Sequence, residues 1–189
     1  MGPAFSDAID RALAMAARAH RTQVRKGDDV PYVQHPVHVA ILLLKHGFAE
    51  PVVIAGILHD VVEDTSVTLA EIRAQFGDDV AKLVDAVSEQ KTDEAGQRPW
   101  RVRKDEQLAK LDAAPLEVVA LKAADVLHNV QTTLRAVQTR GDAVWKRFNA
   151  PKADQLWLQG AVVARVRARL GDHPLARELE EAVVALKNA

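Results

Sequence analysis

Four ionisable side chains follow one another closely at the end of an apolar segment. Residues 52–58 are almost entirely apolar, and His59, Asp60, Glu63 and Asp64 come directly after them. On a helix, residues three or four positions apart share a face, so these polar groups would gather on one side. Imidazole nitrogen with carboxylate oxygen suits Mn, Fe or Zn, and the additional acids could orient a water molecule or move its proton. The alternative is a helix that passes from core to solvent with exposed acids.

His35 is a second candidate ligand. Pro36 follows it, and proline in a first turn places His35 at the beginning of an expected helix that runs to His46. His38 lies one turn later and is a rival ligand. A lone histidine is more often structural than metal-binding, so only the presence of the other candidate donors favours His35 as a metal ligand.

Asp125 falls within a largely apolar helix that is expected to begin at Pro115. A carboxylate in such surroundings requires a partner. Lys122 is one turn before it, and an ion pair between the two would be sufficient. Coordination of a metal by Asp125 is the functional alternative, and His128 competes with it as a ligand.

Basic residues at three places could contact phosphate. Arg25 and Lys26 are adjacent in a loop, residues 23–32, that glycine and proline interrupt. Lys104 lies in the basic first turns of an expected helix, and Arg147 lies in an aromatic and basic turn. Arg25 and Lys26 are ordinarily explained as solvated surface charges. For the turn that contains Arg147, a structural role in which its aromatic side chains pack into the core is an equal alternative.

The composition limits the class of partner. The chain has 189 residues, 48% of them hydrophobic, which fits one globular domain. A formal net charge of −1 gives no general attraction to nucleic acid polymers or acidic membranes, but it permits a small phosphorylated ligand. No apolar run approaches the roughly 18 residues that span a bilayer. The absence of cysteine is compatible with a reducing cytoplasm, where we expect the protein to be located.

The elements that must position these residues are helical. Helix signals predict helices over residues 6–21, 35–46, from 51 onward, 68–76, from 78 or 79 to about 87, 100–113, from 115 onward, 151–170 and 175–187. Ser6 is the expected cap of the first helix, and Thr68 with Glu71 is expected to form a capping box at the start of the helix over 68–76. We find no convincing strand alternation. Residues 88–99 are polar and without periodicity, which predicts a mobile loop that could lie over a site.

The ordered set of His35, the pair His59 and Asp60, and Asp125 resembles the H…HD…D signature of HD-domain phosphohydrolases. Further stretches narrow the resemblance to the hydrolase domain of RelA/SpoT proteins and, at this length, to the small alarmone hydrolases, which include the metazoan SpoT homologue. These stretches are RKG (25–27), PYVQHP (31–36), LHDVVEDT (58–65) and KAADVLHN (122–129). The resemblance covers roughly residues 5–170 and is strongest through Asn129.

The resemblance implies an all-α HD-domain bundle of roughly eight to ten helices in a single domain, residues 1–189. The metal-site core would span about 20–135, and the C-terminal helices 142–189. The implied Mn²⁺ ligands are His35, His59, Asp60 and Asp125, although another divalent transition metal is possible. The implied catalytic acids are Glu63 and Asp64. Arg25, Lys26 and Asn129 match nucleotide-binding positions, and Lys104 and Arg147 match more loosely.

The implied activity is removal of the 3′-pyrophosphate of guanosine tetra- or pentaphosphate by metal-activated water. The alternatives are an HD phosphohydrolase of another nucleotide, such as adenosine 3′-pyrophosphate, NADPH or a deoxynucleotide, and a non-catalytic nucleotide-binding module. The retained acids Glu63 and Asp64 argue against the last. At this length there is no room for a synthetase domain, so we expect no synthesis, and the sequence carries no signal for an oligomeric state.

Overall fold

The computed structural model describes residues 6–27 and 29–189, which divide into two units. The first contains the chain up to Arg25 together with Val30–Ser88, and the second contains Lys26–Asp29 and Glu89–Ala189. Residues 1–5, at the start of the predicted single domain, and Asp28, in the predicted loop 23–32, lie outside the described residues. That the whole chain forms one domain stays a prediction.

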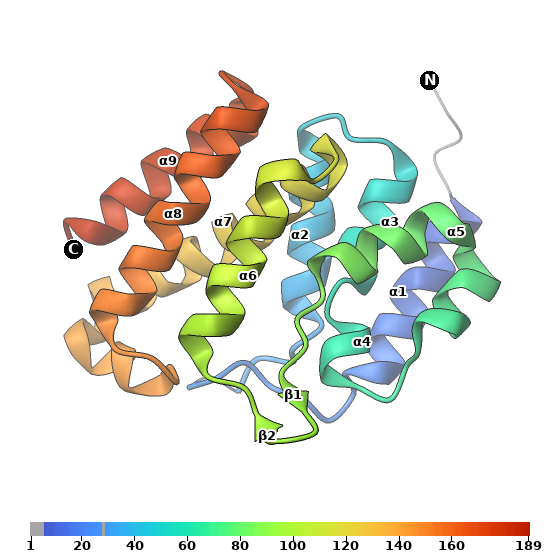
Figure 1. Cartoon of the computed structure of the whole chain (residues 1–189), viewed down its shortest axis with the longest axis horizontal. Helices are drawn as coiled ribbons and strands as arrows, with labels where there is room; N and C mark the ends of the chain where they lie inside the picture. Colours follow the sequence, from blue (N-terminus) through green and yellow to red (C-terminus); the bar gives the residue numbers. More distant parts are fainter. Residues whose placement is uncertain (1–5, 28) are drawn as a thin grey trace. The chain divides into compact units, whose positions relative to one another are not determined.

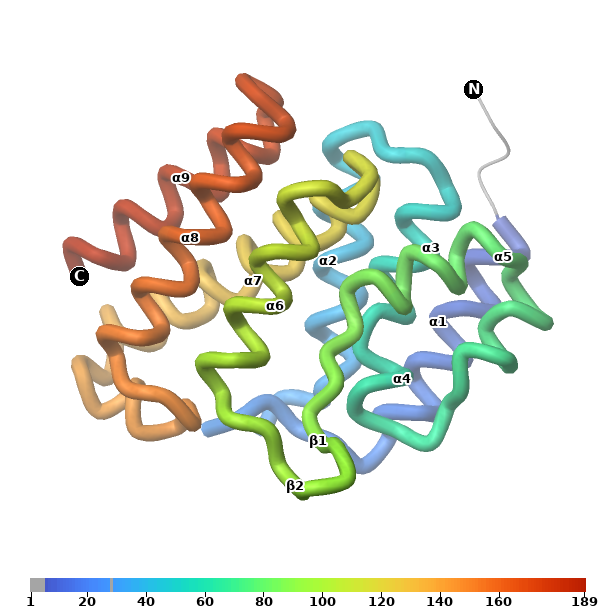
Figure 2. The backbone as a smooth tube through the Cα atoms, in the orientation of Figure 1, coloured from blue at the N-terminus to red at the C-terminus, as the bar shows by residue number. Residues whose placement is uncertain are grey.

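Helices make up the first unit (Figures 1 and 2). They are α1 (Asp7–Ala19), α2 (Gln34–Lys45), α3 (Glu50–Leu58), α4 (Val61–Asp64) and α5 (Leu69–Val87). The hydroxyl of Ser6 accepts from the amide of Ile9 and caps α1, as the sequence predicts, although the helix ends two residues before the predicted boundary. α3 packs against α1, α2 and α5 and is buried from Val52 to Leu58, so it forms the centre of this unit.

Gly56 allows α2 and α3 to approach each other closely. A Cβ at this position would lie 2.7 Å from Cδ1 of Leu43 and 3.5 Å from Cγ1 of Val39, two residues of α2 whose side chains are fully buried. Because α2 carries His35 near its beginning and α3 ends immediately before His59, this contact determines how near the two histidines come.

α5 confirms two predictions about residues 68–87. Thr68 and Glu71 form a reciprocal capping box at its beginning. Gly77, at φ 87° and ψ 173°, interrupts the helical geometry where the sequence predicts one helix to end and another to begin. The bend in α5 is visible in the tube of Figure 2. Only glycine adopts this backbone conformation readily.

The second unit contains α6 (Trp100–Ala113), α7 (Leu116–Arg140), the 3₁₀ segment η1 (Gly141–Arg147), α8 (Lys152–Leu170) and α9 (Pro174–Lys187). α7 packs against η1, α8 and α9, and α6 packs against α8. The largest fully buried aliphatic side chains of this unit come from α7 and α9, and they are Leu121, Leu127, Leu175, Leu179 and Leu186.

A short hairpin lies within residues 88–99, where the sequence predicts a mobile loop. β1 (Thr92–Asp93) pairs antiparallel with β2 (Gly96–Gln97), and Gly96 has φ 111°. Two-residue strands are too short to show alternation, so sequence pattern could not reveal them. Apart from this hairpin and an isolated bridge between Val24 and Pro31, the regular structure of the described residues is helical, which confirms the predicted all-α class and approximate number of helices. Among the described residues, no helix has the length and apolarity needed to cross a bilayer.

Candidate functional site

His59 and Asp60 lie in the turn between α3 and α4. The backbone of both residues stays in the right-handed helical region, with φ −59° and ψ −31° at His59 and φ −98° and ψ −9° at Asp60. The amide of Asp64 donates to the carbonyl of Asp60 at 2.9 Å. The polar segment therefore does not continue one long helix, but its near-helical turn keeps the acidic residues of α4 close to Asp60.

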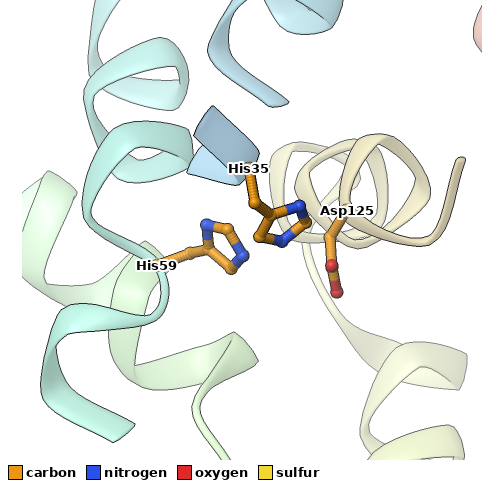
Figure 3. Close-up of side chains that lie close together, drawn as sticks. All are labelled: His35, His59 and Asp125. Carbon is orange, nitrogen blue, oxygen red and sulfur yellow. The ribbon is translucent and has the colours of Figure 1, made fainter. Parts of the chain in front are cut away.

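Two buried imidazoles in the first unit face the carboxylate of Asp60. Nε2 of His59 lies 3.1 Å from Asp60 Oδ2, and Nε2 of His35 lies 3.6 Å from the same oxygen. The two imidazole rings meet edge to face, with centroids 5.1 Å apart (Figure 3). His35 and His59 are only 1% and 4% exposed. The predicted donors His35, His59 and Asp60 are thus brought together within this unit.

A hydrogen bond to the backbone defines the tautomer of His59. Its Nδ1 lies 2.8 Å from the carbonyl oxygen of Gly56. A carbonyl only accepts, so Nδ1 must carry a proton, and in the neutral ring Nε2 then presents a lone pair toward Asp60 Oδ2. A lone pair and a carboxylate oxygen 3.1 Å apart require a proton or a cation between them. Imidazole and carboxylate donors arranged in this way fit a divalent transition metal.

Glu63 and Asp64, the predicted catalytic acids, lie half-buried in α4. The backbone carbonyl of Asp64 accepts from Nε2 of Gln23 at 2.7 Å, which ties the end of α4 to the segment after α1. Glu63 and Asp64 follow Asp60 by three and four positions, which is about one helical turn.

Asp125 lies on α7 in the second unit and is also labelled in Figure 3. Its Oδ2 is 2.9 Å from Nζ of Lys122, and its Oδ1 accepts from Nδ2 of Asn129 at 2.7 Å. The ion pair that the sequence offers as one explanation for Asp125 is thus present. Like His35 and His59, Asp125 is buried and has a donor atom of the type that holds a metal ion. Of the rival ligands, His128 is buried in α7 and His38 is half-buried in α2.

The predicted phosphate-binding residues have different surroundings. The guanidinium of Arg25 lies 5.5 Å from the ring centroid of Tyr32, and Lys26 is exposed. Nζ of Lys104 pairs with Glu89 Oε2 at 2.8 Å. Arg147 donates to the hydroxyl of Thr133 at 3.1 Å. The roles of these residues and of Asn129 in binding nucleotide stay predictions.

Two groups of contacts were not anticipated from the sequence. The hydroxyl of Tyr32 donates to Asp60 Oδ2 at 2.6 Å. In the second unit, the buried carboxylate of Glu89 pairs with Arg103 as well as Lys104, each at 2.8 Å. Tyr32 lies within the PYVQHP stretch that carries part of the family resemblance, and this stretch was the only feature of the sequence that could have pointed to Tyr32. Glu89 is a single acid in a polar segment and gave none.

Comparison with known proteins identifies relatives that match most of the chain. The family model described as HD domain matches residues 12–155. The guanosine-3′,5′-bis(diphosphate) 3′-pyrophosphohydrolase of Aquifex aeolicus is 38% identical over 133 residues, which are 69% of this chain and 18% of that protein. The GTP pyrophosphokinase of Streptomyces coelicolor is 36% identical over 181 residues, 94% of this chain and 20% of that protein. The chain spans about a fifth of the length of these curated relatives.

Two solved structures resemble the chain over most of their own length. The protein lmo0812 from Listeria monocytogenes EGD-e is 35% identical with a TM-score of 0.74, and the match covers 82% of this chain and 99% of that one. A metazoan ortholog of SpoT, described as hydrolysing ppGpp, is 27% identical with a TM-score of 0.77, and the match covers 96% of both chains. The chain therefore belongs to the HD-domain family and, within it, to the RelA/SpoT hydrolase type.

Proposed function

We propose that this protein removes the 3′-pyrophosphate from guanosine tetra- or pentaphosphate with the help of a Mn²⁺ ion. One observation carries the proposal: two buried imidazoles face one carboxylate oxygen of Asp60, and the bond from Nδ1 to Gly56 makes Nε2 the His59 nitrogen that faces this oxygen. The relative from Aquifex aeolicus, named as a pyrophosphohydrolase of this nucleotide, and the metazoan ortholog described as hydrolysing ppGpp support the substrate class.

The proposed ligands are His35, His59 and Asp60 from the first unit and Asp125 from the second. When bound, a divalent ion supplies Lewis acidity and lowers the pKa of a water molecule that it holds. The hydrogen bond from His59 Nδ1 to the Gly56 carbonyl would fix the ring orientation that such a ligand needs. Lys122 satisfies one oxygen of Asp125, and we propose that it is displaced from that oxygen or shares it when the site is loaded.

Glu63 and Asp64 are proposed to orient the attacking water and accept its proton. Their position one helical turn after Asp60, on the short helix α4, supports this role because a general base must lie within hydrogen-bonding reach of the water that it deprotonates. The bond from Gln23 to the Asp64 carbonyl would limit movement of this helix end.

Arg25 and Lys26 are proposed to offset the negative charge that develops on the departing diphosphate, and Asn129, Lys104 and Arg147 to contact the remainder of the nucleotide. Arg25 is half-buried and Lys26 is exposed, so neither is closed off from a ligand by burial. Lys104 would have to share its ammonium group between Glu89 and a phosphate.

The experiment is an incubation of the purified protein and Mn²⁺ with guanosine 3′-pyrophosphates, their adenosine counterparts and NADPH, followed by chromatographic identification of the products. We expect pyrophosphate and the corresponding 5′-nucleotide from the guanosine substrates. Orthophosphate from NADPH, without turnover of the pyrophosphates, would replace the proposed substrate with another. Nucleotide binding without turnover would indicate a non-catalytic module.

Substitutions in the same assay test the ligand assignment. His59→Ala and Asp60→Ala should abolish Mn²⁺-dependent release of pyrophosphate. His38→Ala, which removes a half-buried imidazole on α2 that we do not assign to the metal, is the matched control and should retain turnover. Unchanged turnover in His59→Ala would contradict the proposal.

A further inference from the structure

Tyr32 contacts the same oxygen of Asp60 that faces the two imidazoles. Its hydroxyl donates to Oδ2 across 2.6 Å, while His59 Nε2 and His35 Nε2 lie 3.1 and 3.6 Å from this oxygen. An ionised carboxylate oxygen has two lone pairs, so Oδ2 is able to accept from Tyr32 with one and face the imidazoles with the other. The hydroxyl of Tyr32 therefore restrains the Asp60 carboxylate in the orientation in which it faces the imidazoles.

The aromatic ring of Tyr32 is held in turn by its neighbours. Its centroid lies 4.9 Å from the ring of His20 and 5.9 Å from the ring of His35. The amide of Tyr32 donates to the carbonyl of Gln23 at 2.9 Å, next to the isolated bridge between Val24 and Pro31. The hydroxyl is thus presented to Asp60 from a ring and a backbone that are both fixed.

Gln23 connects this arrangement to the end of α4. Its Nε2 donates to the carbonyl of Asp64 at 2.7 Å, which requires the amide nitrogen to face that carbonyl. Oε1 of Gln23 must then face His20, whose Nδ1 lies 2.6 Å away and donates to it. Hydrogen bonds and ring contacts join His20, Gln23 and Tyr32 into one group that contacts both Asp60 and Asp64.

We infer that Tyr32 is a positioning residue that raises the affinity of the site for its divalent ion by ordering the Asp60 carboxylate. The inference rests on the proposed function, because it presupposes that Asp60 is a ligand. Side chains that hydrogen-bond to metal ligands typically account for roughly 10- to 100-fold in metal affinity or activity. Without the hydroxyl, Asp60 would have to lose rotational freedom when it binds the ion.

The test is the dissociation constant for Mn²⁺, measured by the electron paramagnetic resonance signal of the free ion, for the unaltered protein and for Tyr32→Phe. This substitution deletes the hydroxyl and keeps the ring that contacts His20. We expect affinity to fall by roughly 10- to 100-fold. The matched control is Ser88→Ala, which deletes a hydroxyl bond of the same unit, from Ser88 to the Val84 carbonyl at 2.8 Å, and should leave affinity unchanged.

A double substitution tests whether Tyr32 acts through Asp60. In an Asp60→Ala background, Tyr32→Phe should change Mn²⁺ affinity less than about threefold, because the partner of the hydroxyl is gone. An equal effect in both backgrounds would overturn the inference, as would a Tyr32→Phe protein whose affinity stays within about threefold of the unaltered value.

Urea unfolding of the metal-free proteins separates positioning from general destabilisation. Loss of one net hydrogen bond should shift the unfolding midpoint of Tyr32→Phe only slightly. A large shift, with an unfolded fraction that accounts for the lost binding, would assign Tyr32 a structural role and overturn the inference. If the unaltered protein binds no Mn²⁺, the proposed function itself fails, and this result is distinct from an unaffected Tyr32→Phe.

Discussion

Glu89 should contribute more to stability than any exposed acid of the second unit. Its side chain is 7% exposed, and its two oxygens lie 2.8 Å from Arg103 Nη1 and from Lys104 Nζ. Arg103 is itself 8% exposed at its side chain, and Lys104 is 16% exposed. In Glu89→Ala, a buried guanidinium and a largely buried ammonium would lose their counter-ion.

The expected cost follows from that burial. Removing one partner from a buried ion pair typically costs about 3–5 kcal/mol, since the remaining charge is uncompensated. Nε of Arg103 would still donate to the carbonyl of Arg98 at 3.1 Å, which places the expected loss at the lower end, about 3 kcal/mol. Glu106→Ala is the matched control. Glu106 also pairs with an arginine, Arg98, but its side chain is 50% exposed, so we expect a loss of no more than about 1 kcal/mol.

The assay is urea unfolding at pH 7, followed by tryptophan fluorescence. Trp100, Trp145 and Trp157 are the tryptophans of the chain and all belong to the second unit, so the signal reports the unit that contains Glu89. Equal losses for Glu89→Ala and Glu106→Ala, within about 0.5 kcal/mol, would refute the argument from burial.

Three further predictions concern the first unit. Gly56→Ala would place a methyl group 2.7 Å from Leu43 Cδ1, and such overpacking typically costs about 1–3 kcal/mol. The better helix propensity of alanine offsets about 1 kcal/mol of this cost. The free energy of unfolding, measured by urea unfolding followed by circular dichroism, should therefore fall by up to about 2 kcal/mol. A gain in stability would mean that α2 and α3 are less closely packed. Gly77→Ala, at φ 87°, should cost about 1–3 kcal/mol by the same measurement, and a neutral result would contradict the interrupted helix. Hydrogen bonds from the backbone and side chain of Thr68 lower the pKa of Glu71. The contribution of ionised Glu71 to the stability of the fold is therefore present above its unfolded-state pKa and is lost as pH falls through its folded-state pKa. The stability difference between the unaltered protein and Glu71→Gln should therefore narrow in acid; a constant difference would contradict this.

Local chemistry made several helix boundaries predictable. Ser6 and the pair Thr68 and Glu71 cap the helices that the sequence assigned to them. Gly77 interrupts a helix where predicted, and His35 lies in the first turn of α2. Each of these features depends on residues within four positions of one another, which sequence displays directly.

The contacts of the site depend instead on tertiary packing. His35 and Asp60 are 25 positions apart, and their approach requires α2 and α3 to pack closely at Gly56. No spacing rule could supply that contact, so in the sequence it rested on family resemblance. The bonds from Tyr32 to Asp60 and from Lys104 to Glu89 likewise join residues 28 and 15 positions apart.

The central claim is that His35, His59, Asp60 and Asp125 hold one divalent ion. The most direct test is anomalous diffraction from crystals grown with Mn²⁺. We predict one strong peak within bonding distance of a nitrogen from each histidine and an oxygen from each aspartate. A peak bound elsewhere, or a loaded site in which Asp125 remains paired with Lys122 and far from the ion, would contradict the claim.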